Sequence, residues 1–178
     1  MNKKSLLIVI DMLNGFAKEG KLSSSRINNI IPTIEDMLQN YEHNIFICDH
    51  HSEDDLEMKT YPIHCLANDK ESQIVPELQE YVQKVYYKNT TNGFYDIPMN
   101  LWDQYDEFVL VGCCTDICVM QLALSLKIYL NKINSDKKVI VYSNATDTYD
   151  TPEHNGDKFH NFALDIMKNA GIKIRVWE

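Results

Sequence analysis

The sequence of 178 residues predicts an α/β fold in which helices cover both faces of a parallel sheet. Short apolar segments alternate with segments of helical periodicity about six times along the chain, as in consecutive strand–helix units. The apolar segments are continuous runs rich in Ile, Leu and Val, which indicates strands buried on both faces. The length fits one domain, so we expect a single three-layer α/β/α domain over residues 1–178 with six parallel strands.

Six segments are expected to form these strands: 5–11, 44–49, 84–88, 107–112, 137–143 and 172–177. Each is a short apolar run, and several of the runs end in a charged or small residue. The carboxyl ends of parallel strands meet at one edge of a sheet, where ligands bind in open α/β folds. The residues that follow these runs are therefore the first candidates for a functional site.

Four segments have apolar residues at helical spacing: 31–41, 74–82, 116–133 and 154–171. In the first of them, Pro32 is tolerable only in the opening turn. The last closes on Gly171, which is a common residue for a left-handed helix end. The polar and acidic region at about 50–73 is the least regular part of the chain, and we expect it to be a functional loop excursion.

Charge and composition narrow the class of protein. A net charge of −9 disfavours binding to nucleic acid or to an anionic membrane surface, because both need basic patches. No run approaches the roughly 20 apolar residues of a membrane span, and Asp11 interrupts the N-terminal apolar run that a signal peptide would need. Five cysteines cannot all pair internally, so free thiols in a reducing cytoplasm are expected.

Four of the expected strands end at, or lead into, side chains that can take part in catalysis or bind a ligand. Asp11 ends the first strand, Asp49 the second and Lys88 the third, and the fourth leads to Cys118 in the first turn of a long helix. A helix N-terminus stabilises a thiolate, and its N–H groups can hold a developing oxyanion. Asp11 could then accept the thiol proton, with Lys88 holding the carboxylate and the sulfur in place.

A simpler reading treats Cys118 as a small buried apolar residue, which is the usual role of a lone cysteine. The neighbouring Asp11 and Lys88 favour a reactive thiol instead. Cys113 and Cys114 are expected to pack at the end of the fourth strand. A zinc knot is disfavoured, because the other two cysteines, Cys48 and Cys65, stand alone in the sequence.

A second group of polar residues lies in the excursion, within "CDHHSEDDLEMKTYPIHC" at 48–65. Asp49 and His51 are two residues apart at a strand end, and Glu57 and His64 follow within a short loop. Mixed carboxylate and imidazole ligands suit zinc, manganese or iron(II), with positions left open for water or substrate. The alternative is a solvated acidic loop with surface histidines, since an Asp-x-His motif is common by chance.

Five segments in order along the chain resemble one family: "VIDMLNGF" at 9–16, "CDHHS" at 48–52, "YPIHC" at 61–65, "YYKNTTNGF" at 86–94 and "VGCCTDICV" at 111–119. The chain resembles the isochorismatase-like cysteine hydrolases, and within them the nicotinamidases and pyrazinamidases. The resemblance implies a six-stranded parallel sheet with helices on both faces. It also implies a catalytic triad of Asp11, Lys88 and Cys118.

The resemblance further implies a cis peptide bond between Cys113 and Cys114, which would aim the N–H groups of Cys114 and Cys118 at an oxyanion. It implies a divalent metal ion, with zinc as the first choice and manganese or iron as alternatives. The matching metal ligands are Asp49, His51, Glu57 and His64. Glu53, Asp54 and Asp55 lie near Glu57 in the same loop.

The residues expected to contact the substrate are Phe16, Tyr61 and Phe94. Tyr61 stands where a tryptophan is common in nicotinamidases and Thr91 where a tyrosine is often found, which suggests a wider or more polar pocket. Asp116 is expected to cap the helix that follows it. His154 and His160 are expected on a late helix with only surface or packing roles.

The implied activity is metal-dependent hydrolysis of nicotinamide to nicotinate and ammonia through a thioester, in a cytoplasmic enzyme. The partner would be a small-molecule amide, with no nucleic acid and no membrane, and family members often form homo-oligomers. One alternative is a related amidase that acts on a ureido or carbamoyl compound. Another is a non-catalytic member that binds a small ligand or a protein.

Overall fold

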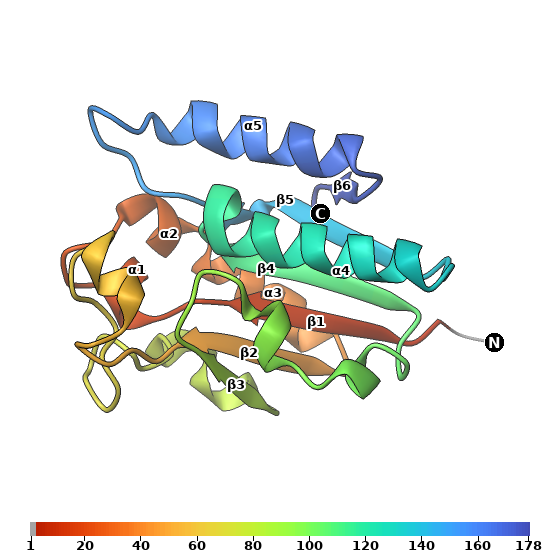
Figure 1. Cartoon of the computed structure of the whole chain (residues 1–178), viewed down its shortest axis with the longest axis horizontal. Coiled ribbons are helices and arrows are strands. Elements are labelled where there is room, and N and C mark those ends of the chain that lie inside the picture. The colour runs from red at the N-terminus through yellow and green to blue at the C-terminus, as the bar shows by residue number, and fades with distance from the viewer. Residues whose placement is uncertain (1–2) are drawn as a thin grey trace.

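A six-stranded parallel sheet forms the centre of the computed structural model, which describes residues 3–178 (Figure 1). The strand order is β3-β2-β1-β4-β5-β6, and every neighbouring pair is parallel. The strands are β1 (Ser5–Ile10), β2 (Asn44–Asp49), β3 (Val85–Lys88), β4 (Glu107–Cys113), β5 (Lys138–Asp147) and β6 (Lys173–Arg175). The predicted α/β fold with six parallel strands is confirmed.

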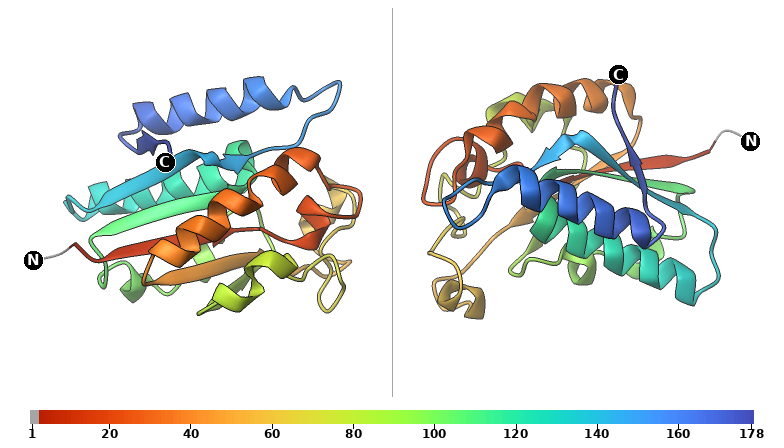
Figure 2. Two further views of the ribbon diagram at one scale, coloured as in Figure 1. Left: turned by 180° about the vertical axis from the view of Figure 1, so that it is seen from behind. Right: turned by 90° about the horizontal axis from the view of Figure 1, so that it is seen from above.

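Helices cover both faces of the sheet, as the opposite views in Figures 1 and 2 show. The helices α1 (Asn14–Ala17), α2 (Ser25–Asn29) and α3 (Ile31–Asn40) lie on one face, and α4 (Met120–Lys132) and α5 (Gly156–Asn169) on the other. Along β1, Leu7 and Val9 pack in the core beneath α1–α3, whereas Leu6, Ile8 and Ile10 pack in the core beneath α4 and α5. This alternation makes each buried strand apolar on both sides.

Several elements differ from their predicted form. The segment 74–82 forms only the 3₁₀ helix η2 (Pro76–Tyr81), in which Leu78 is the one buried residue, too little apolar surface to support a longer α-helix. The short helices α1 and α2 were not predicted, because four or five residues carry no detectable period. The 3₁₀ helix η1 (Leu56–Lys59) lies within the excursion, and η3 (Gly93–Asp96) and η4 (Met99–Leu101) precede β4. The predicted end of the last helix at Gly171 is confirmed by its φ of 87°.

Chain order reverses between β1 and β4, which makes the carboxyl ends of these strands the topological switch point of the sheet. Gly112 of β4 lies opposite Ile10 of β1 and has a φ of 111°. A Cβ atom at this position would lie 2.0 Å from the carbonyl oxygen of Ile10, so only glycine allows this approach. The helices of residues 3–178 include none long and apolar enough to cross a membrane.

Candidate active site

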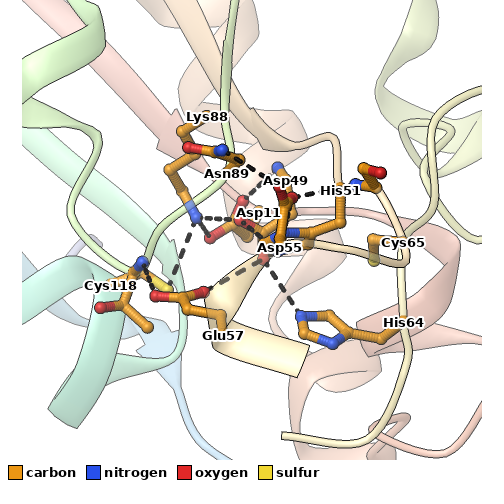
Figure 3. A network of polar contacts seen from close by, with 12 residues as sticks. Asp11, Asp49, His51, Asp55, Glu57, His64, Cys65, Lys88, Asn89 and Cys118 are labelled. Atoms are coloured by element: carbon orange, nitrogen blue, oxygen red, sulfur yellow. Dashed lines mark hydrogen bonds and ion pairs between the residues drawn. The ribbon is translucent and has the colours of Figure 1, made fainter. Parts of the chain in front are cut away.

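The three residues expected to carry catalysis lie together at this switch point (Figure 3). Asp11 follows β1, Lys88 ends β3, and Cys118 lies in the π-helical turn η5 (Thr115–Val119) that begins the long helix. The Nζ atom of Lys88 is 2.8 Å from Oδ2 of Asp11 and 3.8 Å from Sγ of Cys118. All three side chains are buried, so these charges interact with little screening by solvent.

The backbone at Asp11 adopts a left-handed conformation with a φ of 51°, which is uncommon for a residue other than glycine. Its carbonyl oxygen accepts hydrogen bonds from the N–H of Leu13 and from Sγ of Cys113, at 2.8 and 3.1 Å. Its carboxylate accepts a hydrogen bond of 2.9 Å from the N–H of Asp49. Such strained residues often occur at functional sites, where the surrounding structure holds them in place.

The protonation states follow from burial and charge. Burial, together with the nearby carboxylate of Asp49, raises the pKa of Asp11 to about 6. Burial also raises the pKa of the Cys118 thiol well above its usual range, and Lys88 only partly opposes this. At neutral pH the site pairs a protonated thiol with an ionised base that has a pKa suited to general base catalysis.

Lys88 stays charged in this cluster. Burial alone would lower the pKa of its ammonium group, but Asp11 and Asp49 outweigh that effect and raise it. Burial likewise would raise the pKa of Asp49, but Lys88, His51 and His64 together lower it. Lys88 also pairs directly with Asp49. The carboxylates of Asp11 and Asp49 share the single ammonium of Lys88, an arrangement that favours an additional cation.

The turn before Cys118 has the conformation that the resemblance implied, because the peptide bond between Cys113 and Cys114 is cis. The carbonyl of Cys114 accepts hydrogen bonds from the N–H groups of Ile117 and Val119, both at 3.1 Å. The N–H of Cys114 donates to no acceptor within residues 3–178. This donor is therefore free for a ligand in the cavity that Cys114 lines.

Asp49, His51 and His64 could hold a metal ion, since one ligand atom of each lies within 4.8 Å of the others. Nε2 of His51 is 3.5 Å from Oδ1 of Asp49, and Nε2 of His64 is 3.6 Å from Oδ2. Two atoms bound to one zinc ion at about 2.1 Å lie about 3.4–3.6 Å apart in tetrahedral geometry. Nε2 of His51 is buried without a hydrogen-bond partner, as an unfilled ligand atom would be.

The other ring nitrogen of each histidine, Nδ1, contacts an oxygen atom on the side away from the cluster. Nδ1 of His51 is 3.1 Å from Oδ2 of Asp55, and Nδ1 of His64 is 2.8 Å from the carbonyl oxygen of Pro62. Such contacts fix the orientation of metal-binding histidines. Asp55, one of the alternatives to Glu57, therefore supports His51 from the side away from the cluster.

Glu57 lies at the margin of this cluster. Its Oε2 atom is 3.9 Å from Nε2 of His51, but its Oε1 atom accepts a hydrogen bond of 2.6 Å from the N–H of Thr91. The cluster of close ligand atoms contains only the other three expected residues among those that the structure describes. A ligand role for Glu57 stays a prediction.

Asp11 and Cys118 of the triad line one cavity of about 310 Å³, together with Asp49 and His64 of the candidate metal site. Phe16 and Tyr61, which were expected to contact the substrate, line it, and Phe16 contacts His64 with ring centroids 5.6 Å apart. Phe94 does not line it, and this prediction is wrong. The Phe94 ring stacks on Trp102 at 5.8 Å and packs near Tyr129, because it faces the core beneath α4.

A family model for the isochorismatase domain matches residues 5–178. The chain belongs to the isochorismatase family. Nicotinamidase 1 of Arabidopsis thaliana is 27% identical over 207 residues, which cover 94% of this chain and 84% of the plant protein. Family and relative together make this chain a hydrolase that acts on amides.

Two solved structures have the same fold. The pyrazinamidase of Pyrococcus horikoshii in complex with zinc has a TM-score of 0.77 and 23% identity, over 98% of this chain and 99% of that one. N-carbamoylsarcosine amidase from Thermoplasma acidophilum has a TM-score of 0.76 and 21% identity, over 97% of this chain and 96% of that one. Amidases named for different substrates therefore share the isochorismatase-like fold with this chain.

The cavity is also lined by residues that the sequence did not indicate. Leu22, Ile117 and Tyr149 also line it. Ile117 could have been found from its place beside the nucleophile, and Tyr149 from its place after β5. Leu22 lies in a loop without any motif. Thr91 lines the cavity as well, so the noted departure at this position lies where a substrate would bind.

The roles expected for Asp116 and the late histidines need correction. The turn η5 has no side-chain cap, and the carboxylate of Asp116 is instead 2.7 Å from Nε2 of His154. His154 is buried and precedes α5 rather than lying on it. His160 of α5 is 2.9 Å from Oγ1 of Thr115 through its Nδ1 atom. Each histidine thus contacts the turn that carries Cys118.

Proposed function

We propose that this amidase hydrolyses nicotinamide to nicotinate and ammonia, with Cys118 as the nucleophile. One observation carries the proposal: Asp49 and His64, which form a candidate metal site with His51, line the same cavity as Cys118. Nicotinamide has a ring nitrogen and a carboxamide on the same small ring, so it can be held at one group and attacked at the other. The similarity to a plant nicotinamidase supports the same substrate.

The first half of the reaction forms a thioester. Asp11, ionised at neutral pH, accepts the proton of the Cys118 thiol as the sulfur attacks the amide carbon. The N–H groups of Cys114 and Cys118 donate hydrogen bonds to the oxyanion of the tetrahedral intermediate. Asp11 then passes its proton to the departing nitrogen, so that ammonia leaves and an acyl group remains on Cys118.

The second half returns the enzyme to its starting state. Asp11 accepts a proton from a water molecule, which attacks the thioester carbon. The sulfur leaves and regains a proton from Asp11, and the nicotinic acid formed loses its own proton to solvent and leaves as nicotinate. In both halves the ammonium of Lys88, 2.8 Å from Asp11 and 3.8 Å from the sulfur, stabilises whichever of the two groups is ionised.

Asp49, His51 and His64 would hold the metal ion, with Glu57 beside them. Zinc is our first choice for these ligands, with manganese or iron as alternatives, and the zinc complex of the Pyrococcus pyrazinamidase supports it. When bound, the ion would supply a Lewis acid for the pyridine nitrogen and withdraw electron density from the carboxamide. Phe16 and Tyr61 would pack on the ring.

A related function is favoured by one feature of the cavity. Thr91 and Glu57 give part of the wall a polar surface, and the likeness to an N-carbamoylsarcosine amidase extends over nearly the whole fold. The second candidate is therefore an amidase for a ureido or carbamoyl compound. It predicts that hydrolysis does not need the metal ion.

Ammonia release from nicotinamide, pyrazinamide and N-carbamoylsarcosine, with metal-loaded and chelated protein, tests the proposal. We expect release from the two aromatic amides only, lost on chelation and in Cys118→Ala. Cys48→Ala is the matched control, because Cys48 is also a buried free thiol but packs beneath α1–α3. Release from the carbamoyl compound that survives chelation would favour the second candidate instead.

The proposal also suggests a cellular compartment and a metabolic role. A nicotinamidase in the cytoplasm would return nicotinamide to NAD synthesis, and the five free cysteines suit a reducing compartment. Self-association of the chain stays a prediction.

A further inference from the structure

His154 lies in a stack of three aromatic rings outside the catalytic cluster. Its ring centroid is 3.9 Å from that of Tyr149 and 4.0 Å from that of Phe159, with interplanar angles of 15° and 19°. The stack joins the loop after β5 to the first turns of α5, at the same end of the sheet as α1 and α2 (Figure 1).

Polar contacts hold the His154 ring at both of its nitrogens. Its Nε2 atom is 2.7 Å from Oδ2 of Asp116, and its Nδ1 atom is 3.0 Å from the carbonyl oxygen of Tyr149. The ring is thereby fixed between the turn η5 and the backbone of Tyr149. The two faces of the ring are also held, because it stacks between Tyr149 and Phe159.

His154 therefore holds Tyr149 at two points, through the face of its ring and through its backbone carbonyl. Tyr149 lines the cavity that contains Cys118 and Tyr61. The other end of the contact is Asp116, which lies two residues before Cys118 in η5. The second carboxylate oxygen of Asp116 is buried without a hydrogen-bond partner, so the carboxylate depends on His154 for its stabilisation.

We infer that His154 is a positioning residue that fixes Tyr149 as a wall of the substrate cavity and so limits the width of the amide that reaches Cys118. The inference rests on the proposed use of this cavity for substrate. It makes Tyr149 a specificity-determining residue that no motif indicated. It also gives the Asp116 side chain a function in place of helix capping.

Alkylation of Cys118 tests the wall without turnover. Iodoacetamide is a small probe and N-phenylmaleimide carries an aromatic ring, and the rate with Cys118→Ala is subtracted as background. We compare the ratio of the two rates, N-phenylmaleimide over iodoacetamide, in Tyr149→Ala and His154→Phe. Phe keeps a ring between Tyr149 and Phe159 but removes both hydrogen bonds.

We expect each variant to raise the ratio by about 2- to 12-fold, the factor that corresponds to one aromatic contact. The double variant should show no more than Tyr149→Ala alone, because His154 acts through Tyr149. Asp116→Asn keeps an acceptor but removes the charge, and we expect a smaller change in the same direction. It provides a second test if His154→Phe does not fold.

His43→Phe is the matched control. His43 also contacts a tyrosine ring, that of Tyr105 at 5.6 Å, and a carboxylate, that of Glu42 at 3.9 Å, but it precedes β2 at the opposite end of the sheet. We expect it to leave the ratio unchanged. In turnover of an aromatic amide, His154→Phe should raise KM while kcat stays within about 2-fold, since the nucleophile is untouched.

Two results would overturn the inference. An unchanged ratio in Tyr149→Ala would mean that Tyr149 does not limit the cavity. An increase in Tyr149→Ala with none in His154→Phe and Asp116→Asn would mean that His154 does not position it. Neither result depends on hydrolysis of nicotinamide, so failure of the proposed function would be seen separately, as absent ammonia release with the alkylation ratios as expected.

Discussion

Replacing Lys88 with methionine should move the pH dependence of hydrolysis. The substitution keeps an unbranched side chain one atom shorter but removes the ammonium that lies between Asp11 and Asp49. The nearest atoms are 2.8 Å apart, and charge centres about 4 Å apart interact with about 4 kcal/mol at an effective dielectric constant of about 20. This corresponds to a rise of about 3 units in the pKa of Asp11.

The rise predicts a specific loss of rate. With a pKa of about 6, Asp11 is about 90% ionised at pH 7, and a rise of about 3 units would leave about 1% ionised. We therefore expect ammonia release in Lys88→Met to fall about 100-fold at pH 7 and to recover partly above pH 9. The shift is a difference between variant and wild type, so an equal metal load on both proteins does not change it.

Stability should change with pH in the same variant. A carboxyl group whose pKa is raised on folding stabilises the fold when protonated, and that contribution is lost as pH rises through the folded pKa. The extra loss from Asp11 in Lys88→Met should be about 1 kcal/mol at pH 7 and about 4 kcal/mol above pH 9. Urea unfolding at several pH values measures it.

Lys84→Met is the matched control, because Lys84 is exposed immediately before β3 and its ammonium lies over the ring of Tyr86. We expect a wild-type pH profile for this variant. If the acidic limb of the profile in Lys88→Met stays at its wild-type pH, Lys88 does not set the ionisation of the base, and our reasoning on the cluster is refuted.

Three other experiments, each with a matched control, test the site and its support. Phe16→Leu should raise KM for nicotinamide, whereas Phe94→Leu should leave KM unchanged and cost about 1–2 kcal/mol of unfolding free energy; the opposite pattern would put Phe94 in the cavity. Zinc at about 100 times its Kd should stabilise the protein by about 3 kcal/mol in thermal unfolding. His51→Ala should abolish that response, and His50→Ala should keep it, because the His50 ring contacts Tyr87 instead. Gly112→Ala should cost at least about 3 kcal/mol in urea unfolding, because its Cβ would meet the Ile10 backbone, and Gly20→Ala only about 1 kcal/mol, because it meets the flexible end of Glu71; equal losses would contradict the close approach of β1 and β4.

The sheet could be predicted because its signal is local. The apolar runs around Ile8, Phe46 and Val109 are continuous, and such runs form strands whenever both faces are covered. The segments with helical periodicity were harder to predict. Residues 74–82 have helical spacing but bury only Leu78 within η2, so the tertiary structure decided against an α-helix.

The catalytic cluster could be predicted because the strand ends converge at one edge of the sheet. The residues that line the substrate cavity could not all be predicted. Asp11, Lys88 and Cys118 each follow or end a segment that the apolar pattern marks. Phe94 follows Lys88 closely, but the turn Gly93–Asp96 directs it into the core, where it meets Trp102 at the end of η4. The contact of Asp116 with His154 spans 38 residues and has no local signal.

Strand register explains why the charged groups meet. Lys88 of β3 is paired with Asp49 of β2, and side chains at paired positions of parallel strands lie on the same face. A slip of one residue would put Tyr87 in place of Lys88, because neighbouring side chains point to opposite faces. Tyr86 packs in the core beneath α4 and α5 and so specifies the register against this slip. The apolar packing of the short edge strand β3 therefore places the Lys88 ammonium beside Asp11 and Asp49.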